Sequence, residues 1–373
     1  MSQLFIGLMS GTSLDGVDGV LAEFPADGHD TPVSTVATAY IPFPAALRED
    51  LMALQAPADN EIHREAVAAN LIARHYAACV AQLTSQSGIA PAAICAIGAH
   101  GQTIRHRPEA GYTRQINNPS LLAELSSIDV IADFRSRDIA AGGQGAPLVP
   151  AFHQAIFGTT AETRVVANIG GISNISVLDH EQQVIGFDTG PGNVLMDAWV
   201  ARHLGTTFDA DGAWAAGGRV IPSLLQALLD EAFLKLVPPK STGRDLFHSA
   251  WLEHKLSGFA DAGPQDVQAT LTEFTAVTLA NAIADHAKTA KAVYVCGGGA
   301  YNAHLMHRLQ LALTNCGHAA QVASTDALGV SPNHVEALAF AWLAYRHIER
   351  KAGNLPSVTG AKGLRILGAL YPA

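Results

Sequence analysis

The sequence predicts an α/β protein of two lobes, built from two versions of one unit. The 373-residue chain is long for a single core and short for three. Apolar runs of strand length alternate with stretches of helical period throughout the chain. Both halves open with two strand-like runs around a glycine turn, at 4–9 and 17–24 in the first half and at 165–169 and 172–178 in the second. These observations together predict a duplicated α/β fold.

The first half continues as alternating strands and helices. They are expected over 33–43 (strand), 62–86 (helix), 94–99 (strand) and 128–132 (strand). The first helix is expected to end at Gly88, since glycine commonly follows the last helical turn. Asn118 and Pro119 have the residue types of an N-cap and a first helical position, so a short helix is expected before the last strand.

The stretch 138–150 is rich in glycine and proline and is the predicted lobe boundary. The N-terminal lobe would contain 1–137 and about 345–373, and the C-terminal lobe 138–344. In the second half the pattern predicts elements over 184–187 (strand), 193–203 (helix), 264–288 (helix), 293–296 (strand), 302–313 (helix) and 333–350 (helix).

Composition excludes several classes of protein. A net charge of −10 argues against a nucleic-acid or anionic-membrane surface. No window approaches the ~18 to 20 apolar residues that a membrane span needs, and the amino terminus lacks the basic leader of a secretory signal. The four cysteines never form a close pair and the 16 histidines show no metal-ligand spacing, so no zinc or other transition-metal site is expected. We expect a cytoplasmic protein.

The first hairpin turn, 10–16, has the residue types of a phosphate-binding loop. Gly11 and Gly16 let backbone amides approach an anion, and the hydroxyls at positions 12 and 13 are further donors. Asp15 and Asp18 would repel a bare phosphate, so they predict a magnesium ion between them and the phosphate. The alternative is that Asp15 only favours the turn and Asp18 is a solvated strand residue.

A second glycine turn follows the strand that ends at 187. Asp188 is expected at the carboxyl end of this strand, where ligand chemistry gathers in α/β sheets. Gly190 and Gly192 leave room for a phosphate chain, and Asn193 could cap the helix that follows. A carboxylate so placed can act as general base on a hydroxyl or a water. The alternative is an Asx turn that closes a loop.

A third turn contains Gly297, Gly298 and Gly299 between a strand and a helix. Such a turn can hold an adenosine or its phosphates, although glycine runs also occur in ordinary loops. Three glycine turns, each after a strand and two with acids, predict phosphoryl transfer in a cleft between the lobes.

These motifs resemble the family of 1,6-anhydro-N-acetylmuramic acid kinases, in the actin, Hsp70 and sugar-kinase superfold with ribonuclease H-like lobes. The matching segments are 7–18, 98–103, 133–148, 168–174, the Asp188 turn, 296–302 and 333–337. The resemblance implies an interlobe ATP cleft, ATP and Mg²⁺ as cofactors, and a homodimer. It also implies a double reaction in which water opens the anhydro bridge at C1 while the freed O6 takes the γ-phosphoryl group.

The resemblance also implies roles for individual residues. Asp188 would activate the water, and Glu336 and Arg137 would contact sugar or phosphate, with Arg135 as the alternative arginine. His100 and Gln102 would contact the sugar, and Asp15 and Asp18 would hold Mg²⁺. The residues assigned to ATP are Gly11, Thr12, Ser13, Leu14, Asp15, Gly16, Val17, Asp18, Asn168, Gly170, Gly190, Gly192, Asn193, Gly297, Gly298, Gly299 and Asn302.

The chemistry is consistent with these roles. The leaving oxygen can be captured by a phosphoryl group, so one carboxylate base suffices where an ordinary glycosidase needs two. An arginine on the 133–138 loop suits the sugar's lactyl carboxylate, unless it only pairs with Asp133 or Asp138 on the surface. Glu336, an acid on an apolar helix, would be costly to bury without a function.

Two other functions stay open on the sequence. One is an ordinary sugar kinase or nucleotide hydrolase of the same superfold, in which Asp188 activates a hydroxyl or a water that attacks phosphorus. The other is an actin-like or chaperone-like nucleotide switch, against which the absence of an added peptide-binding or polymer-contact domain argues.

Overall fold

The computed structural model describes residues 2–11, 13–25, 33–179, 181, 184–243 and 246–373. These residues form two compact units. Unit 1 contains 1–156 and 334–373, and unit 2 contains 157–333. Among the described residues, no helix is long and apolar enough to cross a membrane.

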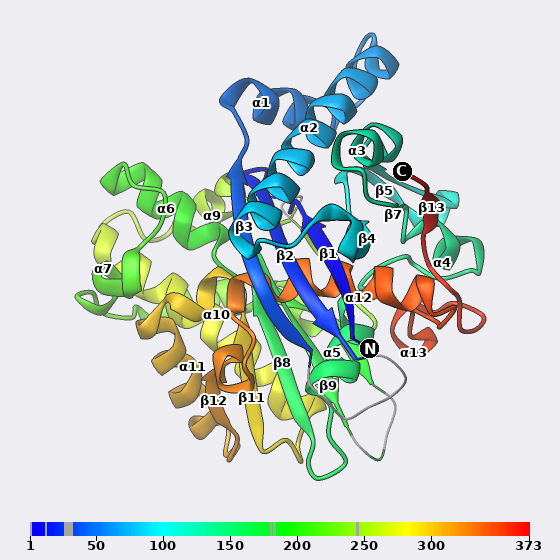
Figure 1. Ribbon diagram of the computed structural model, residues 1–373. Coiled ribbons are helices and arrows are strands. Elements are labelled where there is room, and N and C mark those ends of the chain that lie inside the picture. Colours follow the sequence, from blue (N-terminus) through cyan, green and yellow to red (C-terminus); the bar gives the residue numbers. More distant parts are fainter. Residues whose placement is uncertain (1, 12, 26–32, 180, 182–183, 244–245) are drawn as a thin grey trace. The chain divides into compact units, whose positions relative to one another are not determined.

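Unit 1 is built on a six-stranded sheet of order β13-β7-β4-β1-β2-β3. Its strands are β1 (Gln3–Met9), β2 (Gly16–Phe24), β3 (Ser34–Pro42), β4 (Ile94–Ala99), β7 (Val130–Ala132) and β13 (Ala369–Tyr371), beside the hairpin β5 (Gln102–Arg107) and β6 (Tyr112–Ile116). Strands β1, β2 and β3 form an antiparallel meander, and β4 and β7 continue parallel to β1 (Figure 1). Its helices are α1 (Ala45–Ala53), α2 (Glu61–Ser87), α3 (Pro119–Ser126), α4 (Ser136–Ala140), α5 (Val149–Phe157), α12 (Val335–Ile348) and α13 (Pro356–Thr359).

Two helices cover the two faces of this sheet. Gly19 faces α2, where a Cβ would lie 2.4 Å from Cys79 Sγ. Gly7 and Gly98 face α12, where a Cβ on Gly7 would lie 1.8 Å from the Ala337 carbonyl oxygen and one on Gly98 2.0 Å from that of Phe340. Only glycine permits this approach of helix backbone to strand backbone. The close contact fixes the first turn of α12 against β1 and β4.

Unit 2 is built on a five-stranded sheet of order β10-β9-β8-β11-β12. Its strands are β8 (Arg164–Ile169), β9 (Ile172–Leu178), β10 (Ile185–Pro191), β11 (Ala292–Cys296) and β12 (Gln321–Ser324). Its helices are α6 (Val194–Leu204), α7 (Ala213–Ala216), α8 (Pro222–Leu229), α9 (Ser249–Leu256), α10 (Pro264–His286) and α11 (Ala303–Asn315). Here too a three-stranded antiparallel meander is extended by parallel strands. The predicted duplicated α/β fold is confirmed, since β1–β4 and β7 correspond in order and direction to β8–β12.

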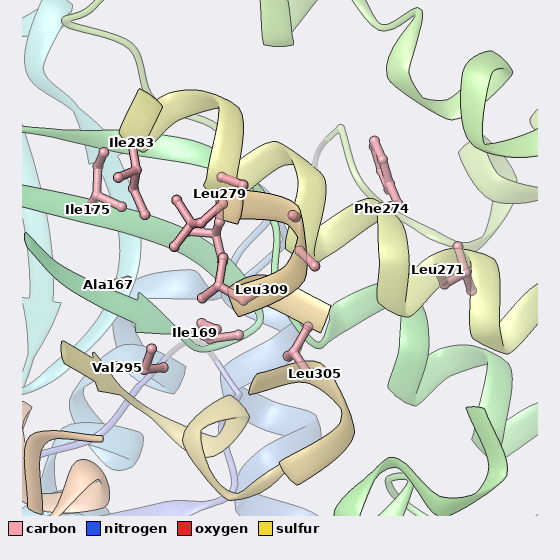
Figure 2. Packing of buried hydrophobic residues seen from close by; sticks show 14 of the residues in the cluster. Ala167, Ile169, Ile175, Leu271, Phe274, Leu279, Ile283, Val295, Leu305 and Leu309 are labelled. Atoms are coloured by element: carbon pink, nitrogen blue, oxygen red, sulfur yellow. The ribbon is translucent and has the colours of Figure 1, made fainter. Parts of the chain in front are cut away.

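One core stabilises the sheet of unit 2. Figure 2 shows side chains of β8 and β11, among them Ile169 and Val295, packed with those of α10 and α11 such as Leu279 and Leu309. These side chains are almost completely buried. Residues 167 and 169 point into this core, so Asn168 between them points to the opposite face of the sheet.

The predicted elements of both halves are present, with ends shifted by a few residues. Helix α2 ends at Gly88, and the Asn118 side chain caps α3 by accepting from the Leu121 amide at 3.0 Å.

The two units divide at 156/157 and 333/334, whereas the predicted lobe boundaries, 137/138 and about 344/345, fall inside unit 1. Two contacts explain the difference. The Gly-Pro-rich stretch is held within unit 1, because the buried Asp138 carboxylate accepts hydrogen bonds from Asn354 and Thr359. All of α12 packs on β1, β2 and β4.

Candidate functional site

The turn between β1 and β2 is anchored by an apolar side chain and open at its glycine. Leu14 is buried, has φ +58°, and donates its amide to the Gly11 carbonyl oxygen at 3.2 Å. A Cβ on Gly11 would meet nothing closer than Ser13 Oγ at 3.6 Å. Leu14 therefore adopts the left-handed conformation in this turn, while Gly11 leaves space beside its Cα. Thr12, which was predicted to donate here, lies outside the described residues.

Asp18 lies in a region of negative charge on the α12 face of the sheet. It pairs with Met9 across the strands, on the same face as Gly7. Burial, then the charges of Asp15 and Glu336, raise its pKa to about 7. Asp15 itself is exposed and accepts from Ser13 Oγ at 2.6 Å. This donor set fits a divalent cation, which would relieve the repulsion between the carboxylates. The described residues contain no group of three metal-ligating side chains, so phosphate or water oxygens would complete such a site.

A buried histidine connects this turn to Arg135. Arg135 Nη2 lies 3.0 Å from His100 Nε2, and His100 Nδ1 lies 3.4 Å from the Ser10 carbonyl oxygen. Burial and the Arg135 charge hold the pKa of His100 well below its usual range. A neutral ring with its proton on Nδ1 then donates to Ser10 and accepts from Arg135. Arg135 Nη1 also donates to the Gly145 carbonyl oxygen at 2.8 Å.

Gln102 holds the turn between β1 and β2 through a hydrogen bond. Its Nε2 donates to the Gly11 carbonyl oxygen at 3.0 Å, and the residue is completely buried. Its Oε1 has no hydrogen-bond partner among the described residues. The sequence predicted Gln102 and His100 as sugar contacts, and this remains a prediction. The structure gives both a role in holding the turn, and leaves one acceptor of Gln102 for a ligand or a water.

The two arginines of the 133–138 loop lie in different surroundings. The half-buried Arg135 guanidinium acts electrostatically with Glu336, which lies in the first turn of α12 and is also half-buried. Burial lowers the pKa of Arg135 to about 10, and the Glu336 charge opposes the shift. Arg137 is exposed and lines a surface hollow with Arg350 and Arg365. Neither Arg135 nor Arg137 forms a described ion pair with Asp133 or Asp138, so the surface-pair alternative does not apply to the described contacts.

In unit 2 the second and third glycine turns meet at the end of β8. The amides of Gly192 and Asn193 donate to the carbonyl oxygens of Gly171 and Gly170 at 2.9 and 2.8 Å. A Cβ on Gly192 would lie 2.2 Å from the Gly170 carbonyl oxygen. Asn193 does not cap α6 as predicted, because its Nδ2 donates instead to the Ile169 carbonyl oxygen.

The triple glycine packs on the same strand end. Gly297 has φ +79°, and a Cβ there would lie 2.5 Å from Asn168 Oδ1. Gly298 is open, with Asn193 Nδ2 its nearest neighbour at 3.7 Å. Seven predicted ATP positions of unit 2 therefore lie around the open position of Gly298: 168, 170, 192, 193, 297, 298 and 299.

The two remaining positions assigned to ATP in unit 2 have structural partners. Asn302 caps α11, since its Oδ1 accepts from the Leu305 amide at 2.9 Å. Gly190 has φ +151° and packs near Leu234 and Thr278. Both positions stay predictions as ATP contacts.

Asp188 belongs to a polar row across the sheet. It pairs with Asn174 of β9, which pairs with Asn168 of β8. All three are half-buried on the face away from the core. Asp188 thus lies within β10, not at its end as predicted, because the strand continues past a register shift to Pro191. Asn174 was missed as a site residue, although its polar character in an alternating apolar strand is the signal that could have identified it.

A loop that sequence reasoning missed holds the Asp188 carboxylate. The Thr242 amide donates to Asp188 Oδ2 at 2.9 Å, and the Asp188 amide donates to the Lys240 carbonyl oxygen at 3.2 Å. Burial raises the pKa of Asp188, while the Thr242 amide, the Ser241 hydroxyl and the Lys240 charge lower it. The loop therefore opposes the effect of burial and favours the ionised form of the carboxylate.

Nearly the whole chain is similar to one family of known proteins. The profile of the family described as anhydro-N-acetylmuramic acid kinase matches residues 3–373. A relative of that name from Paraburkholderia xenovorans is 60% identical over 370 residues, covering 99% of this chain and 98% of the relative. One from Burkholderia orbicola is 58% identical over 370 residues, covering 99% and 96%.

Solved structures give weaker likenesses. The activator of the 2-hydroxyisocaproyl-CoA dehydratase from Clostridium difficile with bound ADPNP has a TM-score of 0.48 at 13% identity, covering 93% of this chain and 96% of its own. A ROK family glucokinase from Streptomyces griseus, in complex with glucose and AMPPNP, has a TM-score of 0.43 at 13% identity, covering 92% and 99%.

Proposed function

The chain belongs to the anhydro-N-acetylmuramic acid kinase family, and from this premise we propose how its two half-sites divide the reaction. The protein is an ATP-dependent anhydro-sugar kinase. It opens the 1,6-anhydro ring of 1,6-anhydro-N-acetylmuramic acid with water and phosphorylates O6, giving N-acetylmuramic acid 6-phosphate and ADP for cell-wall recycling. The first half-site consists of Gly11, Asp18, Arg135 and Glu336. The second half-site consists of Asp188 and the glycine turns around Asn168.

Asp188 is the base in this proposal. The water oxygen attacks C1 while its proton passes to the Asp188 carboxylate, the C1–O6 bond breaks, and O6 bonds to the γ-phosphorus of ATP as ADP leaves. The observation that carries the assignment is the 240–242 loop, which donates to the buried carboxylate and favours its ionised form. Because the phosphoryl group captures the leaving oxygen, the site needs no second carboxylic acid.

The first half-site binds the phosphate end of ATP in this proposal. Gly11 offers an open backbone turn, and Asp15 and Asp18 would hold Mg²⁺ together with phosphate oxygens. When bound, the ion would neutralise charge that develops on the phosphates. Binding would also lower the pKa of Asp18, since the cation replaces the proton that the surrounding acids favour.

Arg135 and Glu336 contact the sugar or the transferred group in this proposal. Arg135 is preferred over Arg137 because its guanidinium is held by His100 and Gly145 and acts electrostatically with Glu336. A guanidinium suits the lactyl carboxylate. His100 and Gln102 are positioning residues here, and the open Oε1 of Gln102 is an acceptor for a sugar hydroxyl or amide.

The turns of unit 2 bind the nucleoside end of ATP in this proposal. Gly298 is exposed and leaves space beside Asn193, and Gly192 and Gly297 bring backbone close to β8. Asn168 and Asn174 extend the polar row from Asp188 toward these turns. The predicted position of ATP in an interlobe cleft stays a prediction.

A homodimer and a cytoplasmic location complete the proposal, on family resemblance and on composition respectively. Light scattering after size-exclusion chromatography tests the first, with a mass of about twice the 39.0 kDa of one chain expected.

The deciding experiment follows oxygen from water. The protein is incubated with Mg²⁺, ATP and the anhydro-sugar in oxygen-18 water, and the products are analysed by mass spectrometry. We expect the label at C1 of a 6-phosphorylated sugar. A sugar phosphorylated on a free hydroxyl, with its anhydro bridge intact and no label, would indicate an ordinary sugar kinase. Label in inorganic phosphate with unchanged sugar would indicate a nucleotide hydrolase.

A further inference from the structure

A basic hollow lies on the surface of unit 1, beside the last turn of α12. Its volume is about 530 Å³, and it is lined by Arg137, His347, Arg350 and Arg365, with Leu364 and Ile366 as apolar neighbours. Sites for small ligands are commonly of this size, roughly 300 to 1,000 Å³. The hollow belongs to neither half-site of the proposed reaction.

The cationic groups of the hollow are not neutralised by the protein. Among the described residues, no carboxylate forms an ion pair with Arg137, Arg350 or Arg365. Arg365 Nη1 donates to the Leu364 carbonyl oxygen at 2.8 Å. Three arginines line one hollow in a chain whose net charge is −10. The local field therefore favours an anion, against the sign of the whole protein.

The backbone at Arg350 is left-handed. Helices α2, α6 and α13 end on Gly88, Gly205 and Gly360, each in the left-handed conformation that glycine adopts freely. After α3 and α12 the left-handed position, at φ +55° in both, is taken by Ser127 and Arg350 instead. A residue with a Cβ is disfavoured in this conformation, so glycine at position 350 would fit the backbone.

We propose that the hollow is a binding site for a small phosphate-bearing anion, of the size of a monosaccharide phosphate. Guanidinium groups bind phosphate oxygens through paired, charge-assisted hydrogen bonds, which the arginines that line the hollow can supply. Leu364 and Ile366 offer an apolar wall for the remainder of such a ligand.

A chain of hydrogen bonds connects the hollow with Arg135. The Arg365 amide donates to Asn354 Oδ1 at 2.7 Å, and Asn354 Nδ2 donates to Asp138 Oδ1 at 2.7 Å. Asp138 Oδ2 accepts from the Gly145 amide at 2.8 Å, and the Gly145 carbonyl oxygen accepts from Arg135.

The test is calorimetric titration with inorganic phosphate and, separately, with glucose 6-phosphate, while a non-hydrolysable ATP analogue fills the nucleotide site. Arg350→Gly and Arg365→Gln are compared with the wild type and with Arg74→Gln, which removes an exposed arginine of α2 in the same unit. We expect both hollow variants to bind glucose 6-phosphate at least about fivefold more weakly, and Arg74→Gln to bind as the wild type.

Arg350→Gly separates binding from folding, because glycine suits φ +55°. We expect its unfolding temperature to equal or exceed that of the wild type, and its kcat at saturating substrates to be unchanged. Native-like binding in both hollow variants would overturn the proposal, as would equal weakening in Arg74→Gln. If Arg350 served only the helix dipole, the variant would lose stability and keep its affinity, which also overturns it.

Discussion

Asp18 and Asp188 are both acids on the strands of corresponding sheets, and burial raises the pKa of each, yet their neighbours differ in sign. Around Asp18 the next causes are the negative charges of Asp15 and Glu336, which raise its pKa further. Around Asp188 they are the Thr242 amide, the Ser241 hydroxyl and the Lys240 charge, which lower it. Among the described residues, the Thr242 amide donates to the Asp188 carboxylate at 2.9 Å, whereas no donor is found for the Asp18 carboxylate.

This difference assigns two kinds of chemistry to two similar side chains. A carboxylate held among other acids gains most from a cation, so Asp18 fits the metal and phosphate side of the reaction. Donors beside a carboxylate oppose the effect of burial and favour its ionised form, which is the form that can accept a proton from water. In the proposed reaction it is the environment of each acid, and not the residue type, that distinguishes a metal ligand from a base.

The largest effect is expected at Asp188. Asp188→Asn removes the proton acceptor while keeping the shape and the hydrogen bond from the Thr242 amide. Turnover should fall about 1,000-fold or more, with ADP affinity by calorimetry within about threefold of the wild type. Asp261→Asn, an exposed acid of the same unit, is the matched control and should keep full activity. A near-native kcat in Asp188→Asn would refute the base assignment.

Substitution of Asp18 should have the opposite effect, because it should weaken the binding of Mg²⁺-ATP and raise the stability of the folded protein. Asp18→Asn should weaken Mg²⁺-ATP roughly 100-fold. Because the folded pKa of about 7 lies above the unfolded value, the native state holds an extra proton between about pH 4 and 7, and ionisation of Asp18 lowers stability as pH rises through 7. The apo variant should therefore unfold at a higher temperature than the wild type at pH 8 and at the same temperature near pH 4.

Asp59→Asn, at an exposed acid of unit 1, is the control for charge alone. An equal gain in stability from Asp59→Asn at pH 8, or unchanged Mg²⁺-ATP affinity in Asp18→Asn, would remove the contrast between Asp18 and Asp188.

A smaller effect is expected at His100, where two substitutions separate its two bonds. Asparagine can reproduce the donor at Nδ1 toward Ser10, and glutamine can approximate the acceptor at Nε2 toward Arg135. We expect His100→Asn to raise the KM for the sugar about tenfold through Arg135. His100→Gln should act more on the KM for ATP, through the phosphate turn. Identical kinetic profiles of the two variants would contradict this division.

The smallest effect is expected at Ser241. Its hydroxyl lowers the pKa of Asp188, so Ser241→Ala should move the acid limb of the kcat profile to higher pH by less than about one unit, with an unchanged rate on the plateau. Thr242→Val keeps the backbone donor and should leave the acid limb in place. A shift in Thr242→Val equal to that in Ser241→Ala would show that the loop acts by packing rather than by hydrogen bonding.

Much of the fold could be predicted because its signals are local. Period-two and period-3.6 patterns lie within single elements, and caps such as Asn118 with Pro119 need only their own helix. The predicted lobe boundary differs from the division into units because that division depends on a contact between Asp138 and Asn354, which are far apart in the sequence. The predicted end of β10 differs for a related reason, since pairing with β9 extends the strand beyond Asp188.

The candidate site divides in the same way. Glycine turns and the acids beside them could be found from the sequence, since a close backbone approach needs glycine wherever it occurs. Lys240, Ser241 and Thr242 could not, because nothing in a short loop distant from Asp188 shows which carboxylate it will meet. The choice between Arg135 and Arg137 could not either, since both lie on one short loop.

By itself the sequence determined the two repeated α/β units, the glycine turns and the acids beside them, because these depend on residue type and spacing. Only the tertiary structure decided the electrostatic state of each acid, the partner of each arginine and the basic hollow at Arg350. The physical reason is that the pKa of a carboxylate and the field around a guanidinium are sums over neighbours in space, most of which are remote along the chain.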